Sequence, residues 1–310
     1  MRTPRQDPIA EAPWIGTLER KRATSQDGTG ISYEVVGRGE RIVLLANGLG
    51  GRLYAWQPFI DRHWRDYRFI TWDYRGLFES DTPQQPNRLA IHHHVEDAVG
   101  ILREEGAGRR AVLVGWSMGV LVSLDVAARH PELVAGLVLL NGIHGQCFGT
   151  GFQPLFPIPS LPKRLHATCE WLRRHPETLD RLRVLTRLSE WPTVAMMALT
   201  AGKRSVALRP VLRRYLDDVL GESFENYMRL FQELDAHSVY HLLPDIEAPA
   251  LVVSGALDIL APSRQSREMA KRMPHAQRIG LWRSSHFSLL ERPEVVLPAL
   301  DRFLERRAEW

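Results

Sequence analysis

Hydrophobic positions follow two patterns of spacing along the first half of the chain. Apolar runs of strand length occur at 31–36, 41–46, 68–73, 111–116 and 133–142. Residues 92–107 and 118–132 instead place apolar side chains at helical spacing, and Pro131 stops the second of these helices. Near-continuous apolar strands that alternate with helices predict a parallel sheet covered on both faces.

This alternation breaks near residue 143. Residues 145–165 are rich in Gly, Pro and Phe and predict an irregular segment, whereas 166–243 predict helices only. Further strands are expected at 250–255 and 277–282, with helices at 263–273 and 292–307. The pattern therefore predicts an α/β fold with a mostly parallel sheet flanked by helices. Its core consists of residues 1–144 and 244–310, and a helical cap is inserted at 145–243.

Composition and charge narrow the class of protein. The 310 residues are 44% hydrophobic and 25% charged, which is typical of a globular chain. No run approaches the roughly 20 apolar residues of a membrane span, and the first residues lack the apolar segment of a secretory signal. We therefore expect a soluble, cytoplasmic protein without a membrane partner. The net charge of +4 comes from 40 basic and 36 acidic residues that interleave along the helices, so we expect no nucleic-acid partner.

The segment Gly115-Trp116-Ser117-Met118-Gly119 matches the pattern G-x-S-x-G between a predicted strand and a predicted helix. In that context the serine lies on a sharp turn, and its hydroxyl projects above the sheet at a helix N-terminus that favours developing negative charge. The two glycines leave room for neighbouring backbone. We therefore predict that Ser117 is a nucleophile. The alternative is an ordinary turn with a capping serine.

A serine hydroxyl needs a base to take its proton, and that base is usually a histidine oriented by a carboxylate. Asp258 follows strand 250–255, and His286 follows strand 277–282. Both lie at the carboxyl edge of the predicted parallel sheet, where such folds place their sites. The order Ser117, Asp258, His286 agrees with the order in this elbow architecture. Asn141 also ends a strand, but its amide cannot act as the anion.

Three further motifs resemble those of the α/β-hydrolase superfamily. NGLGG (47–51) is similar to the H-G-x-x-G oxyanion loop, with Asn47 in place of histidine. DYRGLFESD (73–81) is similar to D-x-R-G-x-G-x-S-D, with Phe78 where glycine is usual. SHFSLLERPE is similar to G-H-F-x-x-x-E-x-P-E, with Ser285 for glycine. The resemblance extends over nearly the whole chain and leaves the three triad residues intact.

This resemblance implies an oxyanion hole and a reaction. The backbone N–H groups of Leu49 and Met118 would stabilise the charge of a tetrahedral intermediate. The implied activity is a cofactor-independent serine hydrolase that cleaves an ester, lactone or related acyl bond of a small molecule. NGLGG followed by Trp56 also resembles 3-oxoadipate enol-lactonases, which favours lactone or enol-ester substrates. C–C bond hydrolases and perhydrolases share the triad and remain alternatives, as does a non-catalytic ligand-binding protein.

We expect neither a metal nor a dinucleotide cofactor. His92, His93 and His94 are consecutive on a helix and cannot converge on one ion, so we expect an exposed first turn. The glycine-rich loop lacks the third glycine of G-x-G-x-x-G, because position 53 is Leu. Cys147 and Cys169 are too few for a disulfide framework, so we expect two reduced thiols.

The candidate substrate-binding residues lie in two places. Asn47 and Trp116 are beside the oxyanion loop and the nucleophile, whereas Trp191 and Met196 lie in the helical insertion. The insertion begins just after one sheet strand and returns just before another, so we expect it to cover Ser117 and to set substrate choice. Its apolar side chains suit an apolar acyl or ring group, although they suit a cap core equally well. They are Trp191, Met196, Met197, Phe224 and Tyr227.

Overall fold

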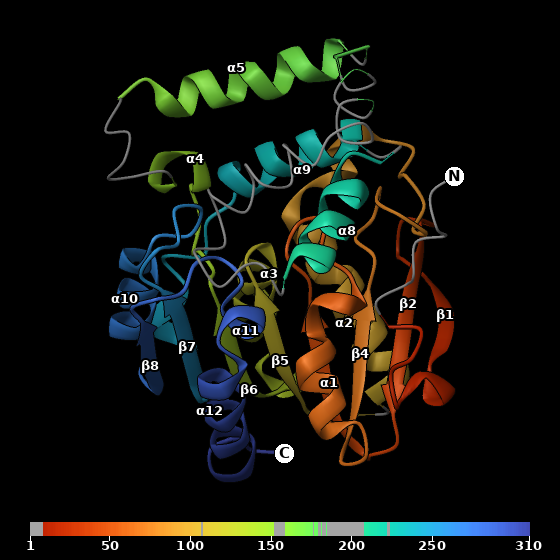
Figure 1. Ribbon diagram of the computed structural model, residues 1–310, viewed down its shortest axis with the longest axis vertical. Coiled ribbons are helices and arrows are strands. Elements are labelled where there is room, and N and C mark those ends of the chain that lie inside the picture. Colours follow the sequence, from red (N-terminus) through yellow and green to blue (C-terminus); the bar gives the residue numbers. More distant parts are fainter. Residues whose placement is uncertain are drawn as a thin grey trace.

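A central eight-stranded sheet organises the computed structural model (Figure 1), which describes residues 9–106, 108–151, 159–175, 177–178, 181, 184, 208–221 and 224–310. The strand order is β1-β2-β4-β3-β5-β6-β7-β8. The pairs β1–β2 and β2–β4 are antiparallel, and every other neighbouring pair is parallel. The strands are β1 Glu19–Thr24, β2 Gly30–Gly37, β3 Arg41–Ala46, β4 Tyr67–Trp72, β5 Ala111–Trp116, β6 Val134–Leu140, β7 Ala250–Gly255 and β8 Ala276–Leu281. The predicted fold class is confirmed.

Helices cover both faces of the sheet because the inner strands are apolar at nearly every position. Successive side chains on a strand point to opposite faces. In β3, Ile42 and Leu44 therefore belong to one buried cluster, and Val43 and Leu45 belong to the other. The first cluster includes side chains from α2 Ile91–Gly106, α3 Met118–Arg129 and α10 Ser263–Arg272. The second includes side chains from α1 Gln57–His63, α11 Ser288–Glu291 and α12 Pro293–Arg306.

The edge strand β1 was not predicted from the sequence. It reads ERKRAT, and none of its residues is fully buried. Its backbone pairs in register with β2, from Glu19 opposite Val35 to Thr24 opposite Gly30. Charged side chains on an edge strand discourage pairing with other chains. An edge strand can therefore lack the apolar run by which the other strands were predicted. Five short 3₁₀ turns are also described: η1 Ile15–Thr17, η2 Leu53–Trp56, η3 Pro86–Leu89, η4 Pro131–Leu133 and η5 Leu243–Asp245.

Among the described residues, four helices between β6 and β7 lie above the sheet in Figure 1. They are α4 Cys147–Thr150, α5 Leu161–Arg174, α8 Arg209–Val219 and α9 Phe224–Ala236. Trp191 and Met196, two of the predicted substrate-binding residues, lie outside the described residues. Met197 does as well.

Two further predictions concern the helices and the surface. His93 and His94 are 6% and 0% exposed, so the expected exposed turn at His92–His94 is wrong for two of its three residues: α2 packs them against the core.

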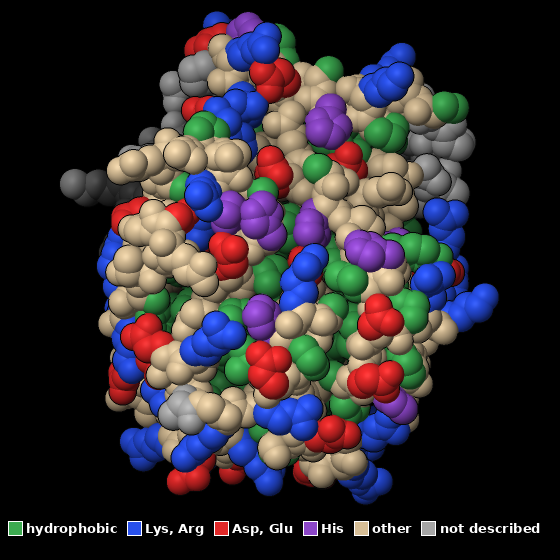
Figure 2. Space-filling model, turned by 180° about the vertical axis from the view of Figure 1, so that it is seen from behind, with side chains coloured by type: hydrophobic (Ala, Val, Ile, Leu, Met, Phe, Trp, Pro, Cys, Tyr) green, Lys and Arg blue, Asp and Glu red, His purple; other side chains and the backbone are tan. Residues whose placement is uncertain are grey.

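Within the described part of the chain, no helix has the length and apolar character to cross a membrane. Acidic and basic side chains are interspersed over the face shown in Figure 2.

Candidate active site

Ser117 lies on a strained turn between β5 and α3. Its φ is 55° and its ψ is −116°, a conformation that L residues adopt only when the surrounding structure imposes it. The flanking glycines explain how the turn fits. A Cβ on Gly119 would collide with the carbonyl oxygen of Ala46 in β3, and a Cβ on Gly115 would lie 2.5 Å from the carbonyl oxygen of Gly119. The backbone thus holds Ser117 in the geometry that the motif predicts.

Asp258 and His286 meet at the carboxyl ends of β7 and β8. His286 Nδ1 lies 2.9 Å from Asp258 Oδ2 and 3.1 Å from Oδ1, and both residues are 5% exposed. Asp258 Oδ1 also accepts the backbone N–H groups of Leu260 at 3.0 Å and Ala261 at 2.8 Å. These bonds fix the carboxylate and leave Nε2 as the imidazole nitrogen that is available to take a proton.

Asn141, at the carboxyl end of β6, is a supporting residue whose role the sequence did not reveal. Its Nδ2 donates to Asp258 Oδ2 at 2.9 Å and to the carbonyl oxygen of Ser285 at 2.8 Å. The residue is fully buried, and its φ of 49° is one that asparagine tolerates better than most residues. Asn141 therefore orients the carboxylate and the loop that carries His286. The only hint of this role in the sequence was the position of Asn141 directly after a strand.

The loop before His286 is also held from the opposite side. Glu291 is 7% exposed, and its carboxylate accepts the backbone N–H of Ser285 at 2.6 Å and the hydroxyl of Ser284 at 2.7 Å. The hydroxyl of Ser285 donates to the same carboxylate. Because hydrogen bonds to a charged group are the stronger kind, this buried carboxylate fixes the backbone that positions the imidazole.

Asn47 holds the loop 47–51 in place. Its Nδ2 donates to Thr71 Oγ1 at 2.9 Å and to the carbonyl oxygen of Trp72 at 3.0 Å, and its Oδ1 accepts Trp56 Nε1 at 2.7 Å. The residue is 2% exposed. The side-chain polar atoms of Asn47 are thus bonded within the protein, and Asn47 is not among the described residues that line the cavity at Ser117. Its contact with substrate stays a prediction.

Trp116 also supports the site. Its Nε1 donates to the carbonyl oxygen of His286 at 2.8 Å. Its ring lies so close to the loop 47–51 that a Cβ on Gly48 or Gly51 would be 2.7 Å away from it. Trp116 is not among the described residues that line the cavity at Ser117. Trp116 therefore connects the loop 47–51 to the loop that carries His286, and its contact with substrate stays a prediction.

A cavity of about 390 Å³ opens onto Ser117 and His286. Leu49 of the loop 47–51 contributes to its wall, and Met118, which is fully buried, begins α3 directly after Ser117. The helices above the sheet supply most of the remaining wall, which is largely apolar. Examples are Phe148, Leu172, Leu216 and Phe231. The volume lies within the ~300–1,000 Å³ that small-molecule sites usually occupy.

A model of the alpha/beta hydrolase fold matches residues 41–293, which is most of the chain. The chain belongs to this family. A strained serine turn and a histidine paired with a carboxylate are the features that hydrolases of this fold use at their sites.

Curated relatives of this hydrolase-fold protein match over most of their length. It is 27% identical to the (E)-2-((N-methylformamido)methylene)succinate hydrolase of Acinetobacter baylyi, covering 88% of this chain and 93% of that protein. It is 28% identical to a putative carbamate hydrolase of Caulobacter vibrioides, covering 92% and 99%. An enol-lactonase structure from Burkholderia xenovorans aligns with a TM-score of 0.72 at 24% identity, covering 92% and 100%.

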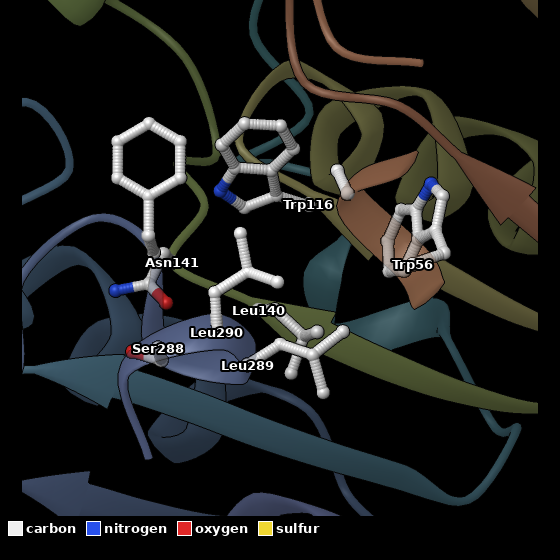
Figure 3. A pocket seen from close by; sticks show the side chains of 9 residues that line it. Trp56, Trp116, Leu140, Asn141, Ser288, Leu289 and Leu290 are labelled. Carbon is white, nitrogen blue, oxygen red and sulfur yellow. The ribbon is translucent and has the colours of Figure 1, made fainter. Parts of the chain in front are cut away.

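A second, much smaller cavity lies beside Asn141, the residue that donates to Asp258. It measures about 20 Å³, and Figure 3 shows Asn141 beside Ser288 and Leu290, with Trp116 across the space. A space of this size holds about one water molecule and no substrate. The cavity at Ser117 is therefore the better candidate for substrate binding.

Two thiols also line the larger cavity. Cys147 and Cys169 are free and buried, in agreement with the expected unpaired state. Burial raises the pKa of both thiols above the ordinary value. Because the thiolate is the reactive form of cysteine, these groups are poor nucleophiles at neutral pH. Ser117 remains the candidate nucleophile in this cavity.

Proposed function

We propose that this protein is a serine hydrolase that cleaves an ester, lactone or related acyl bond in a small molecule. Ser117 is the nucleophile, His286 is the base and Asp258 orients it. The observation that supports the proposal most strongly is the bonded pair of His286 and Asp258, 2.9 Å apart, at the cavity that Ser117 lines on a strained turn.

The reaction proceeds through an acyl-enzyme. Ser117 Oγ attacks the carbonyl carbon while His286 Nε2 takes its proton, and the tetrahedral intermediate forms. The intermediate collapses as the imidazolium gives that proton to the leaving oxygen, and the acyl group stays on Ser117. Water then attacks the acyl-enzyme with His286 again as base, and the acid is released. Asp258 stabilises the imidazolium at each stage.

The backbone N–H groups of Leu49 and Met118 form the proposed oxyanion hole. Two fixed amide donors stabilise the oxyanion without having to reorganise during the reaction. The position of Leu49 in the cavity wall supports this role. Met118 begins α3, so the partial positive charge of that helix end adds to the effect.

The helical insertion 145–243 is proposed as a cap that sets substrate choice, with Trp191 and Met196 as substrate contacts. The apolar side chains that α5, α8 and α9 contribute to the cavity wall favour an apolar acyl or ring group. The named activities of the relatives make carbamates and lactones worth testing beside esters.

Labelling with a fluorophosphonate probe tests the nucleophile. Wild-type protein should gain the mass of one adduct and Ser117→Ala should gain none, because the probe reacts with activated serines. Ser123→Ala is the matched control, since Ser123 is a buried serine of α3 outside the cavity wall. Turnover of ester, lactone and carbamate panels should follow the same pattern. An adduct that persists in Ser117→Ala would overturn the assignment.

A further inference from the structure

Two tyrosine hydroxyls from the insertion meet at one carbonyl oxygen of the oxyanion loop. Tyr215 of α8 donates to the carbonyl oxygen of Leu49 at 2.6 Å, and Tyr227 of α9 donates to the same oxygen at 3.3 Å. The two hydroxyl oxygens lie 3.4 Å apart. These helices are therefore hydrogen-bonded directly to the loop that carries the proposed oxyanion donor.

Each carbonyl around that donor has its own partner. The hydroxyl of Tyr74 donates to the carbonyl oxygen of Asn47 at 2.6 Å, and the N–H of Gly51 donates to that of Gly48 at 2.8 Å. The tyrosines of the insertion hold the third carbonyl, that of Leu49. The core thus holds the carbonyl of Asn47, the loop itself holds that of Gly48, and the insertion holds that of Leu49.

The packing at Gly50 points to the same coupling. Its φ is 81°, a conformation that suits glycine, and a Cβ there would lie 2.8 Å from Val219 Cγ2 and 2.9 Å from Tyr227 Cε2. The helices α8 and α9 therefore pack closely against the loop at Gly50, where the absence of a side chain leaves room for them. A loop with glycines at 48, 50 and 51 has little stiffness of its own, so its shape depends on these outside contacts.

The direction of the Leu49 N–H follows from these restraints. A peptide group is planar, so fixing its carbonyl oxygen also fixes the opposite N–H. The bond from Gly51 N–H to Gly48 O fixes the peptide group that contains the Leu49 N–H. The tyrosines fix the following peptide group, which contains the Leu49 carbonyl and is joined to the first at the Leu49 Cα. Oxyanion stabilisation depends on donors that are aligned before the charge develops.

We propose that Tyr215 and Tyr227 are positioning residues, which complete the oxyanion hole by holding the carbonyl of Leu49 when α8 and α9 are seated on the core. This role rests on the proposed serine hydrolase activity. Catalytic competence then depends on the insertion through two hydrogen bonds, in addition to any contact that the insertion makes with substrate. Burial raises the pKa of both phenols above the ordinary value, so both remain donors through the neutral range.

Phenylalanine variants test the role because they keep the ring and remove only the hydroxyl. We expect Tyr215→Phe to lower kcat about 10-fold and Tyr227→Phe to lower it less, since its bond is longer. Each hydroxyl can partly replace the other, so the double variant should lose more than the product of the two single losses. We expect about 10²-fold, the lower end of what loss of a whole oxyanion donor costs. KM should change little.

Tyr33→Phe is the matched control. Tyr33 is 1% exposed, and its hydroxyl donates to Glu105 at 2.8 Å, away from the cavity. If the loss of a buried hydroxyl lowered activity only through stability, Tyr33→Phe would lower kcat as well. We expect its kcat to equal that of the wild type even where its melting temperature falls as far as that of the double variant.

An alkylboronic acid separates positioning from direct substrate contact, because its serine adduct carries an oxygen that mimics the oxyanion. Its inhibition constant should rise in the double variant by about the factor by which kcat falls. That factor should be the same for acetate, butyrate and octanoate esters. A loss confined to KM, or one that varies with the acyl group, would show that the hydroxyls bind substrate and would overturn the proposal.

Two outcomes separate failure of this role from failure of the proposed function. An active wild type with an unchanged double variant would refute the positioning role alone. A wild type that neither hydrolyses esters nor binds the boronate would refute serine hydrolase chemistry, and the positioning role with it.

Discussion

Replacing Asn141 with glycine isolates the contribution of its side chain to the site. The change removes the donor to Asp258 Oδ2 at 2.9 Å and the donor to the carbonyl oxygen of Ser285 at 2.8 Å. Glycine keeps the φ of 49° without strain, whereas alanine would add about 1–2 kcal/mol at such a position. The variant therefore tests hydrogen bonding without a backbone penalty in the folded state.

The expected magnitudes follow from the partners. A hydrogen bond to a charged group contributes about 1.5–3 kcal/mol and one between neutral groups about 0.5–1.5 kcal/mol, so the free energy of unfolding should fall by about 2–4.5 kcal/mol. Catalysis should suffer less. Asp258 Oδ1 keeps the N–H groups of Leu260 and Ala261, so the carboxylate stays near His286. We expect kcat to fall about 10-fold, which corresponds to about 1.4 kcal/mol.

The assay combines urea unfolding with steady-state turnover of a short p-nitrophenyl ester. Gln146→Gly is the matched control, because Gln146 also has a positive φ, of 54°, and is exposed. Its kcat should equal that of the wild type. If Asn141→Gly lost stability but kept its kcat, Asn141 would be a purely structural residue and the reasoning would be wrong. A loss near 10⁴-fold would show that the carboxylate depends on Asn141 alone.

Three further changes test other parts of the structure. Asp258→Asn should lower kcat about 10⁴-fold through the wrong imidazole tautomer while the melting temperature stays similar; near-normal turnover would refute this role. Phe231→Ala should raise relative kcat/KM for long-chain esters by widening the cavity, whereas a uniform loss would contradict that. Burial lowers the pKa of His94 to about 3. As pH falls below about 6.5, the imidazole of His94 therefore gains a proton in the unfolded chain but not in the folded one, and the free energy of unfolding falls. In urea titrations, the free energy of unfolding of His94→Gln should fall less between pH 7 and pH 4.5 than that of the wild type. An equal fall would refute this effect of His94.

The sequence alone determined the sheet core and the candidate nucleophile. Their signals are local, because apolar runs at 41–46, 111–116 and 250–255 match the observed strands residue for residue. The strand–serine–helix order at Ser117 is likewise contained in a short segment, and it predicted the strained turn. Asp258 and His286 followed from one more rule, that the carboxyl ends of parallel strands meet at one edge.

Only the tertiary structure decided which groups hold those residues in place. Asn141 and Asp258 are 117 residues apart in sequence, and Tyr215 and Leu49 are 166 apart. Such pairs depend on strand order and on how helices seat above the sheet, and neither leaves a periodic signal in the sequence. The hydrogen-bond partners of Asn47 and Trp116 are likewise distant in sequence, so the sequence, which predicted substrate contacts for both residues, did not reveal them. Both side chains are buried, and a buried polar group is almost always hydrogen-bonded within the protein.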